Sequence, residues 1–562
     1  MSQPNPQSMI CRRSLALAGA ALVAASVAGC ASKTPVHTAA SAPRPEQAWV
    51  SSTAPASGKV KTVNWDLFYE PSSIDPIHAL DTTEDEVVSN LCDTLVRMNA
   101  DGTYSPGLAT YSSPNPRTWV YNIHPGVKFW DGKSVNGAEV TSSLNRNLNS
   151  SLGSYYSDFF TNVSSIRQSG PLQVTVKLKR PDELFNQVMS LSAGAVTEEA
   201  YDKAKGKSLG SASGGIMCSG PYKLVKWVPG QSLTMVANHK YWNQAAKPRV
   251  QKIIFSFIAG DSAETNALTS GEIQGMYDTP VSGTSTLQSS KGHLYLGKSL
   301  TQFVVSPVSS TAGNPLQKVA LRQALSLVIN RKQVAGNIFG GVAEVPSSNT
   351  LFSEPVYPYA ASVFRAAQSS FPDLGKVDMA KAKELVAGAG YSKQPIKLAY
   401  ESDGPSYDAE FAQYLQSAAG KIGLVIKLDP LPASTFNEIG FDKSLDAGVD
   451  ASIQYWFNEL PDPVQWYSMF ATPKGASFDV YNYAHYQNPV VAKNIQLAQQ
   501  TTNPVKRAHY VVTAEKQLMH DLPWIPVVDL ANRLYLGKGL TGPTAAYNNM
   551  WTAWATSLGS SK

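Results

Sequence analysis

The sequence predicts a mixed α/β protein with several sheets, and three observations support this fold class. The chain has 562 residues, of which 43% are hydrophobic, so at about 150 residues per domain it is long enough for three or four buried cores. Strand-like and helix-like segments alternate along most of its length, which is typical of mixed α/β folds. No repeat with a period of roughly 20–50 residues is visible, so we expect neither a solenoid nor a propeller.

The first 29 residues have the pattern of an export signal. Arg12 and Arg13 precede Ser14–Gly29, an uncharged, Ala-rich run that ends before Cys30. Such a run after basic residues is typical of a signal peptide, and this one is shorter than the roughly 18 residues of a membrane-spanning helix. Val27-Ala28-Gly29-Cys30 resembles the bacterial lipobox, in which the peptidase cuts before the cysteine and the thiol receives a lipid. We therefore expect a mature lipoprotein that begins at Cys30.

The segment after Cys30 is expected to be a tether. Ala31 to about Gly58 is mostly Ala, Ser, Thr and Pro, a composition that cannot form a core, so folding is expected to begin near Lys59. Loss of residues 1–29 removes two arginines and no acid, which lowers the formal net charge from +5 to +3. No block of five or six like charges occurs, so we expect no nucleic-acid partner.

Two cysteines remain in the folded part of the chain, Cys92 and Cys218. In an exported protein they form either one disulfide or two buried thiols, and the sequence leaves both alternatives open. A disulfide would close a loop of more than a hundred residues and stabilise the fold by about 4–5 kcal/mol in the chain-entropy model. The chain has no CxxC motif and its 8 histidines form no close pair, so we expect no metal site and no cofactor.

The strands and helices are expected in alternation along the chain. Lys59–Phe68 largely alternates polar and apolar residues, as a half-buried strand does, and Thr118–Ile123 is rich in aromatic and β-branched residues. Further strands are expected at Leu172–Leu178, Tyr222–Val228, Ser232–Ala237, Lys252–Ile258, Ile396–Tyr400 and Val425–Leu428. Helices are expected at Asp85–Arg97, Gly137–Asn149, Ser262–Ser270, Pro315–Phe339, Asp378–Ala389, Asp408–Ile422 and Asn503–Leu522.

One short motif raises the alternative of a serine hydrolase. Gly206-Lys207-Ser208-Leu209-Gly210 matches G-x-S-x-G, in which a buried strand before the serine and a helix after it expose the hydroxyl. Here the residues before Ser208 are polar and Ser211–Gly215 is rich in Ser and Gly, so the motif is expected in a loop. We therefore expect no catalytic residue, and a secreted serine hydrolase is a remote alternative.

An aromatic cluster surrounds the segment Asn458–Pro463. Trp456, Trp466, Tyr455 and Tyr467 flank it on both sides. Such a cluster forms either the apolar wall of a small-ligand cleft with one or two fixed charges or an ordinary aromatic core beside a Pro-rich turn. Composition alone favours neither.

Several segments, in order along the chain, carry a family resemblance. They are Ile74-Asp75-Pro76, Leu95-Val96-Arg97, Asp101-Gly102, Pro106-Gly107-Leu108-Ala109, His124–Lys133, Ser219–Tyr222, Trp227–Gly230, Asn238, Tyr241-Trp242, Val319, Arg322–Leu325, Ile329–Arg331, Lys381–Leu385 and Ala389–Tyr391. Together they resemble the family 5 extracellular solute-binding proteins, the peptide and oligopeptide receptors of ABC importers. The similarity runs from about residue 62 to residue 530.

The resemblance implies an α/β, two-lobed, periplasmic-binding-protein-like fold (class II, cluster C) in which crossover strands join the lobes. Lobe I is expected to comprise residues 59–88, 206–300 and 525–562, with an accessory subdomain at 89–205. Lobe II is expected at 301–524. Family members close their lobes over a ligand and then present a surface to the membrane permease.

The resemblance also implies ligand-binding residues. An aspartate that pairs with the peptide's amine in the family corresponds here to Glu459, and we expect Asn458, Trp456 and Tyr455 beside it. The alternative for Glu459 is a solvated turn residue or a helix cap. The stretch Leu80–Thr83 is similar to the family's loop that contacts the peptide backbone, which nominates Asp81, Thr82 and Thr83.

These expectations define one leading function. The chain is expected to be a monomeric, extracytoplasmic lipoprotein, anchored to the membrane through Cys30, that delivers short peptides to ABC permease subunits. The alternative within the family is a receptor for another solute, such as an oligosaccharide stacked on the aromatic side chains, a nickel chelate or haem.

Overall fold

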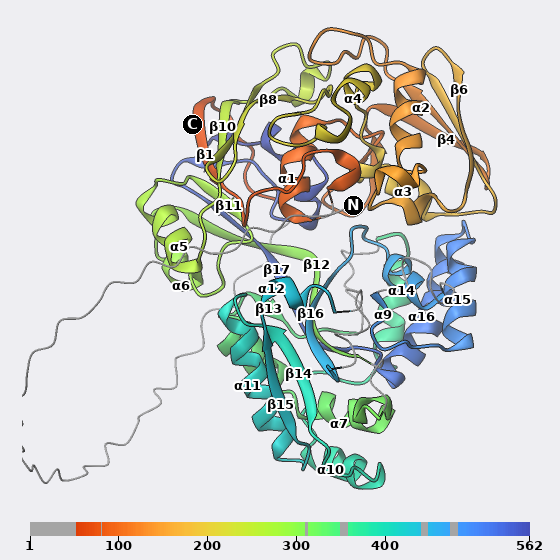
Figure 1. The fold of residues 1–562 in the computed structure, drawn as a ribbon, viewed down its shortest axis with the longest axis vertical. Coiled ribbons are helices and arrows are strands. Elements are labelled where there is room, and N and C mark those ends of the chain that lie inside the picture. Colours follow the sequence, from red (N-terminus) through yellow and green to blue (C-terminus); the bar gives the residue numbers. More distant parts are fainter. Residues whose placement is uncertain (1–51, 80, 309–312, 349–357, 440–447, 472–480) are drawn as a thin grey trace, which may run out of the picture. The chain divides into compact units, whose positions relative to one another are not determined.

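The computed structural model describes residues 52–79, 81–308, 313–348, 358–439, 448–471 and 481–562, which all belong to one compact unit, Glu46–Lys562. The expected signal peptide, Cys30 and most of the expected tether lie outside the described residues. Among the residues described, no helix combines the length and the apolar character that crossing a membrane requires. The interleaved helices and strands confirm the mixed α/β class (Figure 1).

One long sheet organises the molecule. Its strands lie in the order β15-β14-β16-β12-β17-β11-β1-β10-β9-β8, and β13 pairs with β17 beside this path. The strands are β1 (Val60–Asp66), β8 (Tyr222–Val228), β9 (Ser232–Ala237), β10 (Val250–Ser256), β11 (Gly275–Tyr277), β12 (His293–Pro307), β13 (Ala343–Glu344), β14 (Ile396–Glu401), β15 (Ile426–Leu431), β16 (Ala451–Phe457) and β17 (Ile525–Leu536).

The strands β12 and β17 cross from one half of this sheet to the other. They pair antiparallel from His293 opposite Leu536 to Val305 opposite Ile525. At one end β17 also pairs with β11 of lobe I, and at the other end β12 pairs with β16 of lobe II. The pairing shifts register between Lys298 and Gln302, so the ladder is interrupted where the chain passes between the lobes (Figure 1).

Lobe I is built on the parallel neighbours β10, β1 and β11. Its helices are α1 (Thr82–Leu91), α5 (Asp261–Ser270) and α6 (Thr284–Gln288). Trp65 is fully buried, and its ring packs against that of Trp554, tilted by 35° with the centroids 4.3 Å apart. Its Nε1–H donates to Glu86 Oε1 at 2.6 Å. The C-terminal segment thus packs under α1. Its last pieces are the short strands β18 (Leu540–Thr541) and β19 (Gly559–Ser560).

An accessory subdomain follows α1 in the chain. Its four-stranded antiparallel sheet has the order β4-β5-β7-β6, with β4 at Ala109–Asn115, β5 at Thr118–Ile123, β6 at Val163–Gly170 and β7 at Gln173–Leu178. It also contains β2 (Val96–Met98), β3 (Tyr104–Pro106), α2 (Gly137–Arg146), α3 (Leu184–Val188) and α4 (Glu199–Lys205). A disulfide joins Cys92 to Cys218 with the Cα atoms 5.0 Å apart, so the structure has the first of the two cysteine alternatives.

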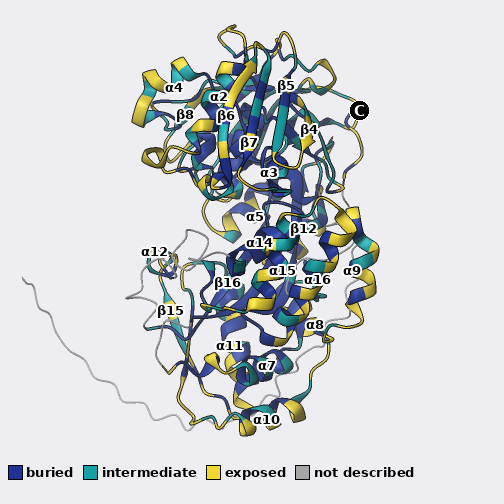
Figure 2. Cartoon of the chain, turned by 90° about the vertical axis from the view of Figure 1, so that its right-hand side faces the viewer, coloured by how far each residue is buried: buried dark blue, intermediate teal, exposed yellow. Residues whose placement is uncertain are grey.

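Lobe II consists of the β14-β15-β16 half of the sheet and its helices. These are α7 (Val319–Val328), α8 (Arg331–Gln333), α9 (Ala361–Gln368), α10 (Met379–Gly388), α11 (Ser406–Gly420), α12 (Ala433–Phe436), α14 (Pro463–Ala471), α15 (Pro489–Gln499) and α16 (Pro504–Asp521). The outer helices α9 and α15 show exposed residues on one side and buried residues on the other (Figure 2). This is the pattern of helices that cover a core.

Two of the predicted helices are wrong in extent. The prediction of one helix over Pro315–Phe339 is wrong because the chain leaves the helical conformation at Ile329, and the Asn330 side chain then caps the separate helix α8. The predicted helix Asp85–Arg97 ends already at Leu91. Its last residues turn into β2, where Val96 pairs with Pro106, so strand pairing overrides the local helical preference.

Candidate ligand-binding site

The segment that carries Glu459 lies between the last strand of lobe II and a helix. β16 ends at Phe457, and α14 begins at Pro463. The backbone N–H of Asn458 donates to the Leu300 carbonyl on β12 at 2.9 Å, which fixes the segment to the crossing strand. Glu459 is therefore held beside the point where the chain passes between the lobes.

Glu459 is a buried carboxylate whose nearest polar partner is neutral. Its side chain is 9% exposed, and its Oε2 accepts a hydrogen bond from Gln465 Nε2 at 3.1 Å. Burial raises the pKa of Glu459 from 4.5 to about 7, and the hydrogen bond from Gln465 opposes this shift. No arginine, lysine or histidine of the described residues forms an ion pair with it. A ligand cation would supply the missing charge.

The start of α1 supplies a second set of carboxylates. Asp81 caps this helix, with Oδ1 accepting from Thr82 N–H at 2.6 Å, and Thr83 is fully buried. Burial and the neighbouring carboxylates of Asp81 and Glu84 raise the pKa of Tyr69. Of the loop nominated in the sequence, Leu80 lies outside the described residues, while Asp81, Thr82 and Thr83 form the first turn of α1 and its cap.

Asp85 lies between the Glu459 segment and the carboxylates at the start of α1 in its electrostatic interactions. It is 2% exposed and accepts a hydrogen bond from the hydroxyl of Ser192 in the accessory subdomain. Burial raises the pKa of Asp85 well above its ordinary value, and the nearby carboxylates of Glu459, Glu84 and Asp81 raise it further. The structure therefore brings Glu459 of lobe II into electrostatic range of the Asp81–Asp85 turn of lobe I.

Asp85 was not nominated in the sequence, although a signal was present. Glu84, Asp85 and Glu86 are three consecutive acids, and all three are buried. Acids at the start of a helix are favoured by its dipole, which explains their tolerance there. A run of three buried acids is rare enough to mark a site, but burial becomes visible only in the folded chain.

The aromatic side chains of the Glu459 segment pack on one another. Trp456 is 7% exposed, and its ring centroid lies 5.1 Å from that of Trp466 and 5.3 Å from that of Tyr483. Tyr455 points to another partner, since its hydroxyl donates to Asp408 on α11. The cluster thus has the packing of an aromatic core, and a ligand contact by Tyr455 or Trp456 stays a prediction.

Two polar atoms beside Glu459 have no hydrogen-bond partner among the residues described. They are Oδ1 of Asn458, whose side chain is 2% exposed, and Nε1 of Trp456. An acceptor and a donor left without partners cost free energy in a buried position, so a polar group that reached either atom would gain a hydrogen bond. The role of Asn458 in binding stays a prediction.

Comparison with known proteins identifies the family. The family model for bacterial extracellular solute-binding proteins, family 5 middle, matches residues 103–478. The chain belongs to this family. Its members bind solutes outside the cytoplasm for ABC transporters, which confirms the resemblance found in the sequence.

Individual relatives of this family 5 protein are distant in sequence but similar over nearly their whole length. The glutathione-binding protein GsiB of Salmonella typhi is 24% identical over 475 residues, which cover 84% of this chain and 89% of GsiB. The ABC transporter substrate-binding protein CtaP of Listeria monocytogenes superposes with a TM-score of 0.76 at 19% identity, covering 90% of this chain and all of CtaP. The oligopeptide-binding protein AppA of Bacillus subtilis, solved in complex with a nonapeptide, superposes with a TM-score of 0.75 at 18% identity, covering 91% of this chain and 100% of AppA. These structures confirm the two-lobed fold.

A second carboxylate of the same segment has a different role in this family member. Asp462 is fully buried and forms an ion pair with Arg507 on α16. Its Oδ2 also accepts from Gln187 Nε2 of the accessory subdomain at 3.1 Å. Next to it the Glu183 N–H donates to the Gln499 carbonyl at 3.0 Å. Asp462 thus ties the accessory subdomain to helices α14–α16.

The G-x-S-x-G motif lacks the geometry of a nucleophile elbow. A helix, α4 (Glu199–Lys205), precedes Ser208 where the elbow needs a strand. The Ser208 hydroxyl donates to the Lys205 carbonyl at 2.8 Å, within its own turn. The relatives found by comparison are solute-binding proteins and not hydrolases.

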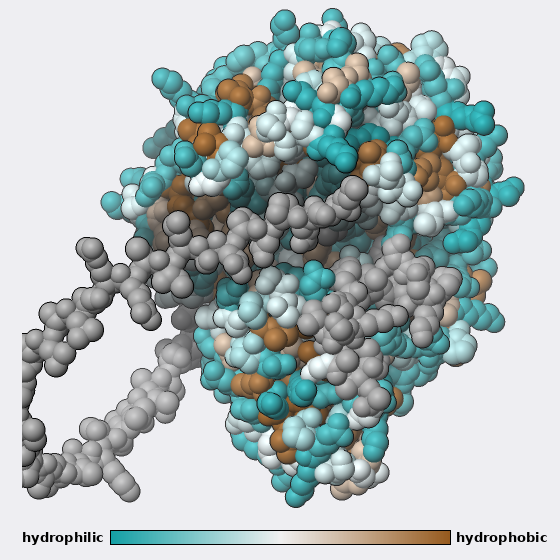
Figure 3. All heavy atoms as spheres, viewed as in Figure 1, coloured by the Kyte–Doolittle hydropathy of each residue, from teal (hydrophilic) through white to brown (hydrophobic). Residues whose placement is uncertain are grey.

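Hydrophilic residues predominate over both lobes on the face that Figure 3 shows. Glu84, Asp85 and Glu86 in α1 and Glu459 after β16 are instead buried acids. A solute that reaches them meets negative charge that water does not screen.

Proposed function

We propose that this family 5 protein captures short peptides and that Glu459 accepts their free amine. The observation that carries the proposal is a 9% exposed carboxylate that no cation of the described residues neutralises. The peptide's ammonium group would pair with it. A ligand without a cation would leave the carboxylate buried and unpaired, so the site would reject it.

The pKa of Glu459 gives this proposal a pH dependence. With a pKa of about 7 in the free protein, the carboxylate is ionised above pH 7 and protonated below it. An ammonium group binds the ionised form, so peptide affinity falls about tenfold for each pH unit below the pKa. Ligands that do not use Glu459 would lack this slope.

The proposed protein acts outside the cytoplasm as a lipoprotein. The signal-like residues 1–29 and the lipobox-like Val27–Cys30 support export and lipidation of Cys30, and the disulfide between Cys92 and Cys218 suits an oxidising compartment. The monomeric protein would hand its ligand to ABC permease subunits and carry out no chemical reaction. Retention of label from radioactive palmitate, lost in Cys30→Ser, would test the anchor.

The decisive experiment identifies the ligand and then removes the charge. Native mass spectrometry of the purified protein is expected to reveal a ladder of co-purified peptides. Calorimetry with such a peptide is expected to show at least about a hundredfold weaker binding for Glu459→Gln, together with loss of the pH slope. The matched control is Glu272→Gln, the same change at an exposed position, which should bind normally. Unchanged affinity in Glu459→Gln would refute the amine role.

The ligand panel should include the other solutes of the family. Glutathione belongs in it because the relative GsiB is named for that tripeptide. Oligosaccharides, a nickel chelate and haem complete it. A thermal shift with one of these and none with peptides would replace the peptide by another solute and leave the receptor function intact.

A further inference from the structure

A groove on lobe I is lined by basic side chains. It has a volume of about 680 Å³ and lies between the start of β1 and the connection from β9 to β10. Its cationic lining residues are Lys59, Lys61, Lys247 and Arg249, with His239 beside them. No aspartate or glutamate belongs to the lining. We call these four lysine and arginine residues the root patch.

The charges of the root patch are available to a partner. Lys59, Lys61 and Lys247 are exposed, and Arg249 is partly buried. In the described part of the chain none of the four forms an ion pair or a side-chain hydrogen bond.

The root patch lies where the folded part of the chain begins. Thr53 Oγ1 donates to the Pro543 carbonyl at 3.0 Å, and the N–H groups of Ser57 and Gly58 donate to the Ser560 carbonyl at 3.0 Å. The chain is therefore fixed on lobe I directly before Lys59. Residues 31–51, which connect this point to Cys30, span at most about 75 Å when extended.

We propose that the root patch binds the anionic phospholipid headgroups of the membrane to which Cys30 is anchored. The proposal rests on the lipid anchor of the proposed function and is independent of the ligand. Four unpaired cations without a carboxylate among them complement a surface of phosphates. An anchor within tether length keeps that surface at high effective concentration, so weak contacts suffice.

The membrane is the partner that this position favours. A charged patch elsewhere on the chain would meet the membrane only in some orientations. The root patch follows the tether directly, because the chain enters the fold at Thr53–Gly58 and Lys59 is the next residue. Binding would hold lobe I against the headgroups.

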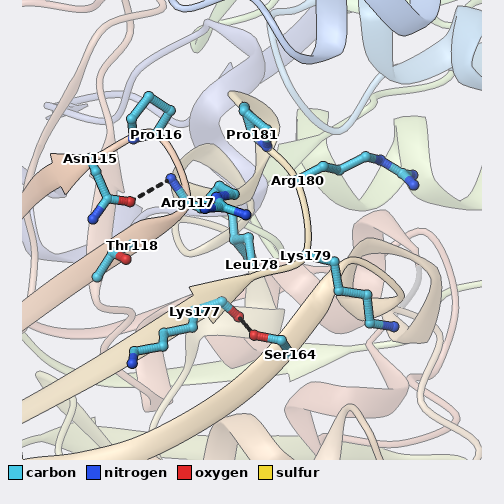
Figure 4. Close-up of a pocket in the computed structure, with 10 residues that line it drawn as sticks. All are labelled: Asn115, Pro116, Arg117, Thr118, Ser164, Lys177, Leu178, Lys179, Arg180 and Pro181. Atoms are coloured by element: carbon cyan, nitrogen blue, oxygen red, sulfur yellow. Dashed lines mark hydrogen bonds between the residues drawn. The ribbon is translucent and has the colours of Figure 1, made fainter.

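A second basic pocket provides the matched control. It has a volume of about 780 Å³, lies on the accessory sheet, and its lining includes Arg117, Lys177, Lys179 and Arg180 but no acid (Figure 4). It carries the same number of lysine and arginine residues as the root patch. It lies at β5 and β7, on a different sheet from β1 and β10. Neutralising either set changes the net charge by the same amount.

The test measures partition of the chain from residue 31 onward, which lacks the signal and Cys30 but retains every described contact. Low ionic strength is used, because charge contacts are strongest there and can be detected without the anchor. The probes are sedimenting vesicles of phosphatidylcholine with phosphatidylglycerol and vesicles of phosphatidylcholine alone. The test variant is Lys59→Gln/Lys61→Gln/Lys247→Gln/Arg249→Gln. The control variant is Arg117→Gln/Lys177→Gln/Lys179→Gln/Arg180→Gln. Circular dichroism and thermal unfolding establish that both fold.

The expected result is salt-sensitive binding to the anionic vesicles only. At about fivefold per charge near a membrane surface, the root-patch variant should bind well over tenfold more weakly, and the control variant should stay within about threefold. Equal losses in both variants would mean a net-charge effect and overturn the proposal, as would full binding by the root-patch variant or no preference for anionic vesicles. Palmitate labelling of the full chain and of Cys30→Ser, measured separately, distinguishes this outcome from a failure of the lipid anchor on which the proposal rests.

Discussion

Two buried carboxylates, three positions apart in one segment, have opposite surroundings. Asp462 is fully buried, pairs with Arg507 and accepts a hydrogen bond from Gln187. Glu459 is 9% exposed and accepts one hydrogen bond from the neutral Gln465. The first carboxylate is compensated by the protein itself, whereas the second has no cation among the residues described.

This difference distinguishes a carboxylate that stabilises the fold from one that is suited to ligand binding. A buried ion pair holds elements together, and removing one member leaves an unpaired charge. A buried carboxylate without a cation destabilises the ligand-free protein. Binding of a cation offsets this unfavourable free energy, so the carboxylate favours cationic ligands. Glu459 is therefore the better candidate for ligand recognition, and Asp462 for the contact between the accessory subdomain and α14–α16.

The largest effect is expected from breaking the ion pair of Asp462. Arg507→Met removes the cation and also the hydrogen bond from Nε to the Ala498 carbonyl at 3.0 Å. Asp462 would then be a buried charge without compensation, which costs about 3–5 kcal/mol. Urea unfolding followed by fluorescence should show a clearly lower midpoint for this variant.

A double variant checks this explanation. In Asp462→Asn/Arg507→Met both charges of the ion pair are removed, and the new amide oxygen can still accept from the Val464 N–H as Asp462 Oδ1 does at 3.0 Å. Asp182 and Glu183, which Arg507 also attracts, are the carboxylates that stay nearby. The double variant should therefore recover a large part of the lost stability. If it is as unstable as Arg507→Met alone, packing rather than charge explains the loss.

The opposite sign is expected for Glu459. Its pKa rises from 4.5 in the unfolded chain to about 7 in the folded protein, so the folded state binds the proton more tightly. Stability is lost as the pH rises from 4.5 to 7, up to about 3 kcal/mol. Glu459→Gln should therefore stabilise the ligand-free protein at pH 8 and leave it nearly unchanged at pH 4.5.

Thermal unfolding at the two pH values measures this effect. The ligand-free state is verified by native mass spectrometry, because a bound amine would hide the cost. Glu272→Gln, at an exposed position, should shift neither midpoint. A destabilised Glu459→Gln protein at pH 8 would show that an unseen cation already compensates the carboxylate.

The contrast between the two carboxylates was only half predictable from sequence. Glu459 was nominated because it corresponds to an aspartate of the family, and Asp462 lies three residues later in the same segment. Their roles depend on Arg507 and Gln187, which are distant in sequence. Which carboxylate meets the arginine is a property of tertiary packing, and no local pattern encodes it.

The fold shows the same division between local and tertiary information. β8 and β9 were predicted to the residue. β9 has a strict half-buried alternation, and β8 pairs with it after a short turn. The crossing strands β12 and β17 were not predicted. The second half of β12 and nearly all of β17 are buried on both faces, and such strands lack the alternation that reveals a strand.

The smallest loss of stability is expected when the hydrogen bond from Gln187 to Asp462 is removed. Gln187→Ala removes one hydrogen bond to Asp462 and leaves the ion pair with Arg507 intact, so it should cost about 1 kcal/mol. Hydrogen exchange should become about fivefold faster at the Glu183 amide, which bonds across the same contact.

Gln168→Ala, at an exposed position of β6, is the matched control. Peptide affinity should stay within about twofold in Gln187→Ala, whereas Glu459→Gln should change affinity and leave the Glu183 exchange as it was. If both variants changed both quantities, the two carboxylates would form one coupled unit, and the division between a structural and a ligand-binding carboxylate would fail.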